Sequence, residues 1–383
     1  MLKKFIIYKM INCKEFYDLL IEKKIDFFTG VPDSLLKDFC AYITDKTNPM
    51  NHIIAANEGG SIALATGYHL ATGKVGLVYM QNAGQGNAIN PLVSLADPDV
   101  YSIPILLIIG WRGEPGKKDE PQHIKQGKIT LGLLDTLGIS YEILPDSVED
   151  LEKKLEYAVN YMRIKSAPFA FVVREGTFEP YTLKNKIKTN YELSREDAIK
   201  LIVDRLELKD IVISTTGKTS RELFEYRKEL GQEHEKDFLT VGSMGHTSKI
   251  ALGIALSKPD RQVYCFDGDG AVIMHMGSLA IIGSKNPKNF KHIIFNNGAH
   301  DSVGGQPTVG FDIDFLGIAK SCGYKLVLRA ETKNEIKEKI DILRLSDGPC
   351  LLEIRISKGA RGNLGRPNIT PKENKENFMK FLK

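Results

Sequence analysis

The chain has 383 residues, enough for two domains of ordinary size, and its 42% hydrophobic and 26% charged residues are typical of a globular protein. A net charge of +4 from dispersed basic residues does not indicate nucleic-acid binding, and the longest strongly apolar run, 103–111, is too short to cross a membrane. The five cysteines are widely spaced and form no CxxC pair, so we expect reduced thiols in a cytoplasmic protein.

The first half of the chain alternates short apolar runs with helical patterns. Buried parallel strands are continuous apolar runs, so this alternation predicts a mostly parallel sheet covered by helices. The predicted strands are 25–29, 53–56, 75–80, 105–109 and 170–173, and the predicted helices are 13–23, 61–71, 88–96 and 151–162. We expect these elements to form a first domain at residues 1–178.

A polar segment at 179–193 contains Pro180, several lysines and little apolar periodicity, which predicts a linker. Ser194 then opens a helix with acidic residues in its first turn. The pattern restarts with predicted strands at 211–214, 263–266, 293–295 and 351–354 and helices at 249–256 and 371–383. The sequence thus predicts an α/β fold of two doubly wound, mostly parallel-sheet domains, the second at 194–383.

Two turns at the ends of neighbouring predicted strands carry metal-binding and phosphate-binding residue types. Gly268-Asp269-Gly270 follows one apolar run, and after 25 further residues Asn296-Asn297 follows the next. Ligands of parallel sheets bind at the carboxyl ends of strands, where Asp269 and Asn297 fall. A carboxylate and an amide oxygen suit a small hard cation, and Gly270 allows a backbone N–H to approach a phosphate. These turns predict a site for a magnesium diphosphate.

This pair of turns resembles the cofactor motif of thiamine diphosphate enzymes. The resemblance implies that Mg²⁺ is held by Asp269, Asn297 and the backbone carbonyl of Ala299, with Gly268, Gly270 and Ala271 against the cofactor. It also implies a pyrimidine-binding first domain and a diphosphate-binding second domain. Only a short linker separates the two, so no middle domain is expected.

Asn57-Glu58-Gly59-Gly60 begins a segment of small residues that continues to Thr72-Gly73-Lys74. A glutamate at a helix start is usually a surface charge that complements the helix dipole. This motif, however, resembles the other half of the thiamine site. It implies that Glu58 shares a proton with the aminopyrimidine ring, so that the resulting imine can take the C2 proton of the cofactor.

Two further loops are cofactor candidates. The stretch 215–220 follows a strand and is either a simple strand-to-helix turn or a cap on the diphosphate through Gly217 and Thr219. In Gly242-Ser243-Met244-Gly245 the methionine would ordinarily fill a core. The resemblance implies instead that Met244 supports the bent cofactor beside Ser243, while the Gly242 carbonyl accepts a hydrogen bond from its amino group.

Several residues at strand ends are substrate candidates. Asp33 precedes a helix and is expected to cap it, but in the resembled family an aspartate of this loop faces the substrate. His123 lies in a predicted charged loop after a buried strand and is a candidate proton donor. An anionic substrate tail would need cations or N–H donors, for which the candidates are Arg112, His123, His300, Ser302, Gly304 and Gly305.

The run 297–307, with 30–36 and 119–128, closely resembles the phosphonopyruvate decarboxylases over nearly the whole chain, although Asp301 stands where glutamate is more usual. The resemblance implies decarboxylation of 3-phosphonopyruvate to phosphonoacetaldehyde and CO₂ in the biosynthesis of phosphonates such as 2-aminoethylphosphonate. Glu58, Asp33 and His123 are the implied catalytic residues. Cofactor binding between domains of different subunits, and hence a homodimer or higher homo-oligomer, is also implied.

Three alternatives remain at this level. Sulfopyruvate decarboxylases share the architecture and carry out the same chemistry on a sulfonate. A carboligase would normally have a middle domain, for which this chain has no room. A non-catalytic cofactor-binding subunit is disfavoured because Glu58, Asp269 and Asn297 occur in one chain.

Overall fold

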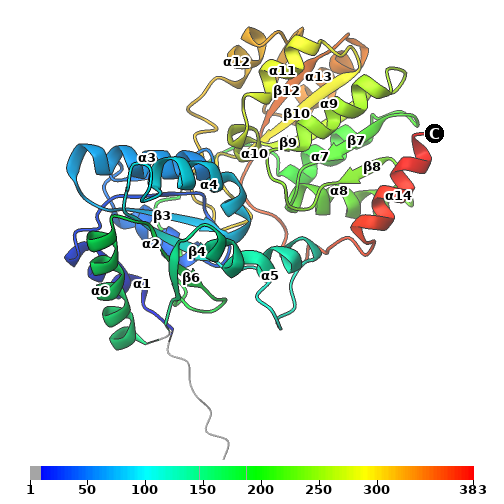
Figure 1. The fold of residues 1–383 in the computed structure, drawn as a ribbon. Coiled ribbons are helices and arrows are strands. Elements are labelled where there is room, and N and C mark those ends of the chain that lie inside the picture. Colours follow the sequence, from blue (N-terminus) through cyan, green and yellow to red (C-terminus); the bar gives the residue numbers. More distant parts are fainter. Residues whose placement is uncertain (1–9, 146, 187) are drawn as a thin grey trace, which may run out of the picture. The chain divides into compact units, whose positions relative to one another are not determined.

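The computed structural model describes residues 10–145, 147–186 and 188–383 (Figure 1). The chain divides into two compact units. The first takes the residues up to Lys186 together with Val303–Gln306, and the second takes Ile187–Ser302 and Pro307–Lys383. Within the described residues no helix is both long and apolar enough to cross a membrane.

The first unit is a six-stranded, wholly parallel sheet with the order β2-β1-β3-β4-β6-β5. Helices α1, α2 and α6 pack on one face, and α3, α4 and α5 on the other. The strands are β1 (Phe28–Gly30), β2 (His52–Ile54), β3 (Gly76–Gln81), β4 (Ile105–Gly110), β5 (Ser140–Ile143) and β6 (Phe169–Val173). The helices are α1 (Cys13–Glu22), α2 (Lys37–Lys46), α3 (Glu58–Thr72), α4 (Gln85–Pro91), α5 (Pro121–Thr136) and α6 (Val148–Lys165).

The second unit is a parallel sheet with the order β11-β12-β10-β9-β7-β8. Its strands are β7 (Ile211–Ser214), β8 (Asp237–Leu239), β9 (Val263–Gly268), β10 (Phe290–Asn296), β11 (Leu326–Ala330) and β12 (Cys350–Arg355). One face carries α7 (Arg195–Val203), α8 (Lys218–Glu229) and α13 (Lys333–Leu345). The other carries α9 (Thr247–Ser257), α10 (Asp269–Met274), α11 (Ser278–Lys285), α12 (Phe315–Ser321) and α14 (Pro371–Phe381).

The two units share one topology. Counted from the first strand of each unit, both sheets have the order 2-1-3-4-6-5. In each, the chain reverses its direction of winding between the first and third strands, and ligands of such sheets bind at the carboxyl ends of those strands. The predicted fold class of two doubly wound parallel-sheet units is confirmed, and each unit has one such switch point: β1/β3 and β7/β9.

The sequence pattern missed three strands and misplaced some ends. β5 and β11 are half-buried and polar in part, and β8 has only three residues, so none is a continuous apolar run. The strand predicted at 25–29 begins only at Phe28, and the helix predicted at 88–96 is α4 followed by a π-helical turn at Leu92–Ala96. A helix was expected after Asp33, where α2 lies, but without bounds, and α5 was not predicted.

Part of the predicted linker packs against the first unit. The backbone N–H of Tyr181 donates to Asp38, and those of Lys184 and Asn185 donate to Asp45. Leu193 belongs to the second unit, where its carbonyl accepts from the N–H of Ser357. The residues of this segment that the structure describes are therefore tied at both ends, and the exact domain boundary stays a prediction.

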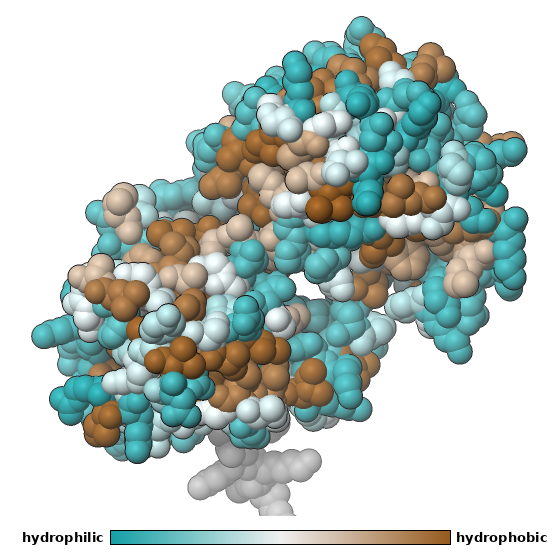
Figure 2. All heavy atoms as spheres, turned by 45° about the horizontal axis from the view of Figure 1, so that its top comes forward, coloured by the Kyte–Doolittle hydropathy of each residue, from teal (hydrophilic) through white to brown (hydrophobic). Residues whose placement is uncertain are grey.

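Large apolar side chains are exposed on both units, as the brown areas of Figure 2 illustrate. On α3 they follow one helical face, where Leu64 and Leu70 are exposed and a side chain added at Gly67 would meet open space. On the second unit Leu256 and Ile281 are exposed. Exposed apolar helix faces of this kind are typical of protein–protein contact.

Candidate active site

Asp33 lies at the switch point of the first unit, just beyond β1, and is fully buried. Its Oδ2 accepts from the N–H groups of Leu35 (2.7 Å) and Leu36 (3.3 Å) in the turn before α2. The N-cap of α2 is Leu36, so the predicted helix cap at Asp33 is wrong. Its Oδ1 accepts from the side chain of Gln81 at the end of β3, 2.7 Å away. A side chain at Gly110 would clash with Asp33, since its Cβ would lie 2.3 Å from Oδ2. The carboxylate is thus fixed between three strands.

Glu58 is the first residue of α3 and is buried. Asn57 caps the helix by accepting from the N–H of Gly60. The Oε2 of Glu58 accepts a 2.7 Å hydrogen bond from the side chain of Asn87 on α4. Gly84 makes room for the carboxylate, because a Cβ there would lie 2.4 Å from Oε1. The predicted small-residue helix is confirmed as α3. The Glu58 side chain is buried within the first unit and is not a surface charge.

Arg112 follows β4 and is engaged within the first unit. Its guanidinium donates two hydrogen bonds to Asp119, at 2.8 and 2.5 Å, and a third to the Ser34 hydroxyl at 2.7 Å. Burial raises the pKa of Asp119, but the hydrogen bonds from Arg112 and from the N–H of Gly113, together with the charges of Arg112 and His123, lower the pKa overall. The hydrogen bond from Arg112 to Ser34 ties the loop after β4 to the loop after β1.

His123 does not lie in a loop, which corrects the sequence-based prediction. Pro121 begins α5, and His123 is half-buried in its first turn. Proline favours the first helical turn because its missing N–H would be unpaired there. Burial and the nearby Arg112 charge lower the pKa of His123, so its imidazole is neutral at neutral pH.

Asp269 lies at the carboxyl end of β9 in the second unit and is 3% exposed. Its carboxylate accepts from the Thr308 hydroxyl and from the backbone N–H of Asn297. Burial raises the pKa of Asp269 to about 6, partly offset by these hydrogen bonds. A Cβ at Gly310 would lie 2.6 Å from Oδ2 of Asp269. A buried carboxylate with only neutral donors around it is a favourable place for a cation.

The Asn296–Ala299 turn lies next to Asp269 because Phe295 pairs with Gly268 across β10 and β9. The Asn296 side chain points into the unit, donating to the Gly310 carbonyl (2.6 Å) and to Glu353 (2.8 Å). Asn297 is buried, and its Oδ1 accepts from the N–H of Ala299 at 3.1 Å. The structure therefore brings Asp269, Asn297 and Ala299 together, with oxygen donors that fit Mg²⁺.

The side chains of His300 and Met244 lie against Gly270. A Cβ on this glycine would lie 3.2 Å from the His300 ring and 3.5 Å from the Met244 terminal methyl. Burial lowers the pKa of His300 to about 4. Met244 and His300 thus meet over Gly270, in the turn predicted to receive a diphosphate. The backbone N–H of Gly270 donates to the Asp269 carboxylate, and its approach to a phosphate stays a prediction.

The Gly242–Gly245 loop has left-handed backbone at Gly242, Ser243 and Gly245, with φ of 63°, 45° and 80°. The N–H of Gly242 donates to the Thr216 hydroxyl at 3.0 Å. A side chain at Gly245 would collide with α10, since its Cβ would lie 2.9 Å from the Ala271 carbonyl. The contacts at Gly242 and Gly245 fix the loop on both sides of Met244, and the left-handed backbone restricts its conformation. The loop therefore presents Met244 in one position.

The turn after β7 contains Gly217, whose φ of 94° favours glycine, and the buried Thr219. A Cβ on Gly217 would lie 3.4 Å from the Ser302 hydroxyl, so this turn meets the loop after β10. Lys218 donates to the backbone carbonyl of Asp301 at 3.1 Å, and the Arg195 guanidinium lies 3.7 Å from the Asp301 carboxylate. Asp301 is therefore anchored by two cations.

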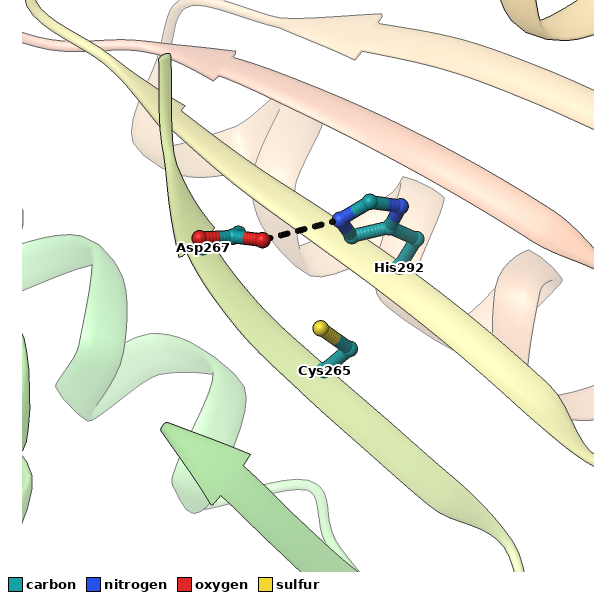
Figure 3. A group of neighbouring side chains, drawn as sticks. All are labelled: Cys265, Asp267 and His292. Atoms are coloured by element: carbon teal, nitrogen blue, oxygen red, sulfur yellow. Dashed lines mark ion pairs between the residues drawn. The ribbon is translucent and has the colours of Figure 1, made fainter. Parts of the chain in front are cut away.

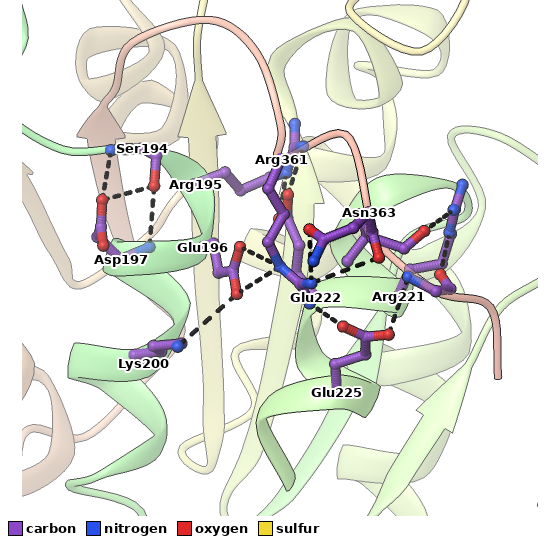
Figure 4. A network of polar contacts seen from close by, with 12 residues as sticks. Ser194, Arg195, Glu196, Asp197, Lys200, Arg221, Glu222, Glu225, Arg361 and Asn363 are labelled. Atoms are coloured by element: carbon purple, nitrogen blue, oxygen red, sulfur yellow. Dashed lines mark hydrogen bonds and ion pairs between the residues drawn. The ribbon is translucent and has the colours of Figure 1, made fainter. Parts of the chain in front are cut away.

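A charged network supports the same turn (Figure 4). Arg195 pairs with the buried Glu222 of α8 at 2.7 Å. Arg361, in the segment before α14, contacts Glu196 of α7 and Glu225 of α8. These contacts attach the segment after β12 to the two helices and fix the start of α8, where Gly217 and Thr219 lie.

Gly304 and Gly305 have φ of 127° and 79° and belong to the segment Val303–Gln306 that clusters with the first unit. Gln306 is fully buried and donates to the Lys37 carbonyl at 3.2 Å. Substrate binding by Ser302 and this glycine turn stays a prediction, as do the other assigned roles.

Sequence reasoning missed four residues whose side chains hydrogen-bond candidate site residues. They are Gln81, which bonds Asp33, Asn87, which bonds Glu58, Asp119, which bonds Arg112, and Thr308, which bonds Asp269. Gln81 directly follows the strand predicted at 75–80, so the rule that ligands bind at strand ends could have found it. Nothing in the local pattern indicates Thr308, which is 39 residues from its partner.

Comparison with known proteins adds independent information. The N-terminal TPP-binding domain of thiamine pyrophosphate enzymes matches residues 14–131, and the C-terminal TPP-binding domain matches residues 215–354. The chain is 33% identical over 364 residues to a phosphonopyruvate decarboxylase of Streptomyces viridochromogenes, covering 90% of this chain and 89% of that protein.

Sulfopyruvate decarboxylases are also related. The protein from Methanosarcina acetivorans is 25% identical, covering 95% of this chain and 96% of its own length. A sulfopyruvate decarboxylase subunit beta of Methanococcus maripaludis is 33% identical but covers only 50% of this chain, with 99% of its own length.

Proposed function

Because the chain belongs to the phosphonopyruvate decarboxylase family and carries both TPP-binding domains of thiamine pyrophosphate enzymes, we propose that it decarboxylates 3-phosphonopyruvate to phosphonoacetaldehyde. The relatives and the two matched domains show a thiamine pyrophosphate-dependent decarboxylase. Membership of a decarboxylase family argues against a carboligase and against a non-catalytic subunit.

One observation carries the proposal: Asp269, Asn297 and Ala299 converge at the carboxyl ends of β9 and β10, beside the glycine at 270. We propose that Asp269, Asn297 and the Ala299 carbonyl hold Mg²⁺, which binds the cofactor diphosphate. Gly217, Thr219, Gly242, Ser243, Gly268, Gly270 and Ala271 line the cofactor, and Met244 supports it.

Bound thiamine diphosphate supplies the nucleophilic carbanion and the electron sink for loss of CO₂ from a 2-oxo acid. Glu58 holds a proton against the pyrimidine ring of the cofactor, and Asn87 and the glycine at 84 keep its carboxylate in place. Asp33 and His123 orient the substrate and transfer protons to the product. The buried position of Asp33 excludes water from its neighbourhood.

The phosphonate tail needs hydrogen-bond donors that pyruvate would leave unpaired. Arg112, His300, Ser302 and the Gly304-Gly305 turn are the proposed donors. The guanidinium of Arg112 already binds Asp119 and Ser34. It therefore serves as a pre-oriented cation, whose position is set before the substrate arrives.

We propose that the active enzyme is a homodimer or higher homo-oligomer, in which Glu58 of one subunit and Asp269 of another meet the same cofactor. The exposed apolar face of α3, which begins at Glu58, supports this arrangement. A related sulfopyruvate decarboxylase has a separate subunit that matches half of this chain. A dilution series that yields fully active monomers would contradict the shared site.

We propose phosphonopyruvate rather than sulfopyruvate as the substrate. The chain is 33% identical to the phosphonopyruvate decarboxylase, against 25% for the full-length sulfopyruvate decarboxylase. We place the reaction in the cytoplasm and in biosynthesis of phosphonates such as 2-aminoethylphosphonate. The test is a decarboxylation assay with phosphonopyruvate, sulfopyruvate and pyruvate side by side, with cofactor and with or without Mg²⁺. Faster turnover of sulfopyruvate would overturn the substrate assignment, and activity unaffected by Mg²⁺ removal would overturn the metal assignment.

A further inference from the structure

Three side chains with metal-binding atoms meet inside the second unit (Figure 3). Cys265 and Asp267 lie two residues apart on β9, so their side chains are on the same face of the sheet. His292 of β10 pairs with Cys265 across the two strands. All three are 0% exposed. The thiol, one carboxylate oxygen and one ring nitrogen lie within 4.8 Å of one another.

Two atoms of this cluster lack hydrogen-bond partners. Oδ2 of Asp267 and Nε2 of His292 face each other at 3.6 Å, and within the described residues neither atom has a hydrogen bond. This distance exceeds that of an N–H···O hydrogen bond. Buried polar atoms without hydrogen-bond partners destabilise a fold, so the arrangement calls for a ligand or ion between them.

The nearest cation does not resolve this deficit. The Lys249 amine donates to the backbone carbonyls of Gly245 (2.7 Å) and His275 (3.4 Å) instead of to Asp267. Nδ1 of His292 is already engaged by the Tyr324 hydroxyl at 3.2 Å. Nε2 is therefore the ring nitrogen that remains to face Asp267.

The geometry suits a tetrahedral metal ion. Metal bonds of about 2.0–2.2 Å at a tetrahedral angle place nitrogen and oxygen ligands roughly 3.3–3.6 Å apart, which agrees with the 3.6 Å observed. A thiolate, an imidazole and a carboxylate are zinc ligands, whereas Mg²⁺ avoids sulfur. A hydrogen bond on the second histidine nitrogen, here to Tyr324, is typical of metal-bound histidine.

We propose that Cys265, Asp267 and His292 bind one Zn²⁺ ion, at a site separate from the proposed Mg²⁺ ligands Asp269 and Asn297. Binding forms one bond from each of the three side chains to the ion and releases the Cys265 thiol proton to solvent. The ion links β9 to β10 directly before the Gly268–Gly270 turn. Because the cluster is fully buried, the ion is acquired on folding and stabilises the second unit.

The first experiment measures metal content by mass spectrometry in protein produced with Zn²⁺ and then dialysed against EDTA. We expect about one zinc per wild-type chain, and less than about a tenth of that in Cys265→Ser and in His292→Gln. Cys40→Ser and Cys350→Ser change equally buried cysteines outside the cluster and should retain zinc. Wild-type protein with less than about a tenth of an equivalent of zinc would overturn the proposal and leave a buried histidine–aspartate pair only.

The second experiment identifies the ligands in protein produced with Co²⁺ in place of Zn²⁺. A thiolate bound to cobalt gives a charge-transfer absorption band in the near ultraviolet. This band should be lost in Cys265→Ser but remain in Asp269→Ala, which alters only the proposed diphosphate site. Retention of the band in Cys265→Ser, or its absence from cobalt-loaded wild-type protein, would overturn the assignment even if a variant folded poorly, because the wild-type spectrum is decisive by itself.

Discussion

The side-chain nitrogen of Asn87 donates a 2.7 Å hydrogen bond to Oε2 of Glu58, and so joins α4 to the first residue of α3. This contact leaves Oε1 of the carboxylate, which lies over the glycine at 84, available for another partner. In the proposed site, we infer that Asn87 determines which oxygen of Glu58 meets the cofactor.

Asn87→Ala should lower kcat by roughly 10- to 100-fold with little change in KM, because loss of one hydrogen bond to a charged group costs about 1.5–3 kcal/mol in alignment of the base. In the Glu58→Gln background the same substitution should have almost no further effect. Steady-state kinetics of the four proteins checks this. Asn90→Ala, on the exposed side of the same helix, is the matched control. Equal losses in both backgrounds would show that Asn87 acts independently of Glu58.

Glu58→Gln should remove most activity while leaving cofactor affinity nearly unchanged. An amide cannot share a proton with the pyrimidine ring, so a loss of about 10²-fold or more in kcat is expected. Activity assays combined with calorimetry of cofactor binding separate the two effects. Turnover close to wild type would refute the assignment of Glu58.

Asp269→Ala should abolish Mg²⁺-dependent retention of the cofactor, because the site loses its carboxylate ligand. The same change also removes the acceptor of the Thr308 hydroxyl. Thr308→Val, which removes only that hydroxyl, should retain most of the Mg²⁺ dependence. The measurement is calorimetry of cofactor binding with and without Mg²⁺, and unchanged affinity in Asp269→Ala would rule out its role as a ligand.

Phosphonopyruvate should be preferred over pyruvate by at least roughly 10³-fold in kcat/KM, since two or three unpaired polar groups at about 1–3 kcal/mol each are left by pyruvate. Arg112→Ala should reduce this preference by harming phosphonopyruvate more. Asp119→Ala removes the partner of Arg112 but keeps its charge, so it should retain more of the preference. If both variants slow both substrates alike, the pair serves only to hold the loops together.

Asp210→Asn should stabilise the protein at neutral pH. Burial raises the pKa of Asp210 from 3.8 to about 6, so the folded state binds more protons than the unfolded state between these values. Stability from this group is present at low pH and is lost as pH rises towards 6. The variant keeps an acceptor for the N–H of Glu207, and at pH 7 its free energy of unfolding should increase by about 1–3 kcal/mol. Urea denaturation at pH 4 and pH 7 checks this: an equal change at both would contradict it.

Local sequence patterns were sufficient for much of the fold. Apolar runs predicted the central strands, because strands buried on both faces must be apolar throughout, as in β4 and β6. Ser194 and its acidic neighbours predicted the start of α7, where Ser194 and Asp197 form a capping box. Edge strands such as β5 and β8 escaped this reasoning because one side of each strand is not fully enclosed.

By itself the sequence determined the residue types and spacing of the candidate site: Glu58 before a small-residue helix, and Asp269 and Asn297 at the ends of two neighbouring strands. These depend on local backbone geometry, which short patterns encode. Tertiary structure alone decided which side chains support them, because Asn87 and Thr308 reach Glu58 and Asp269 through packing of separate elements. It also decided that Cys265, Asp267 and His292 meet, since the register between β9 and β10 pairs His292 with Cys265.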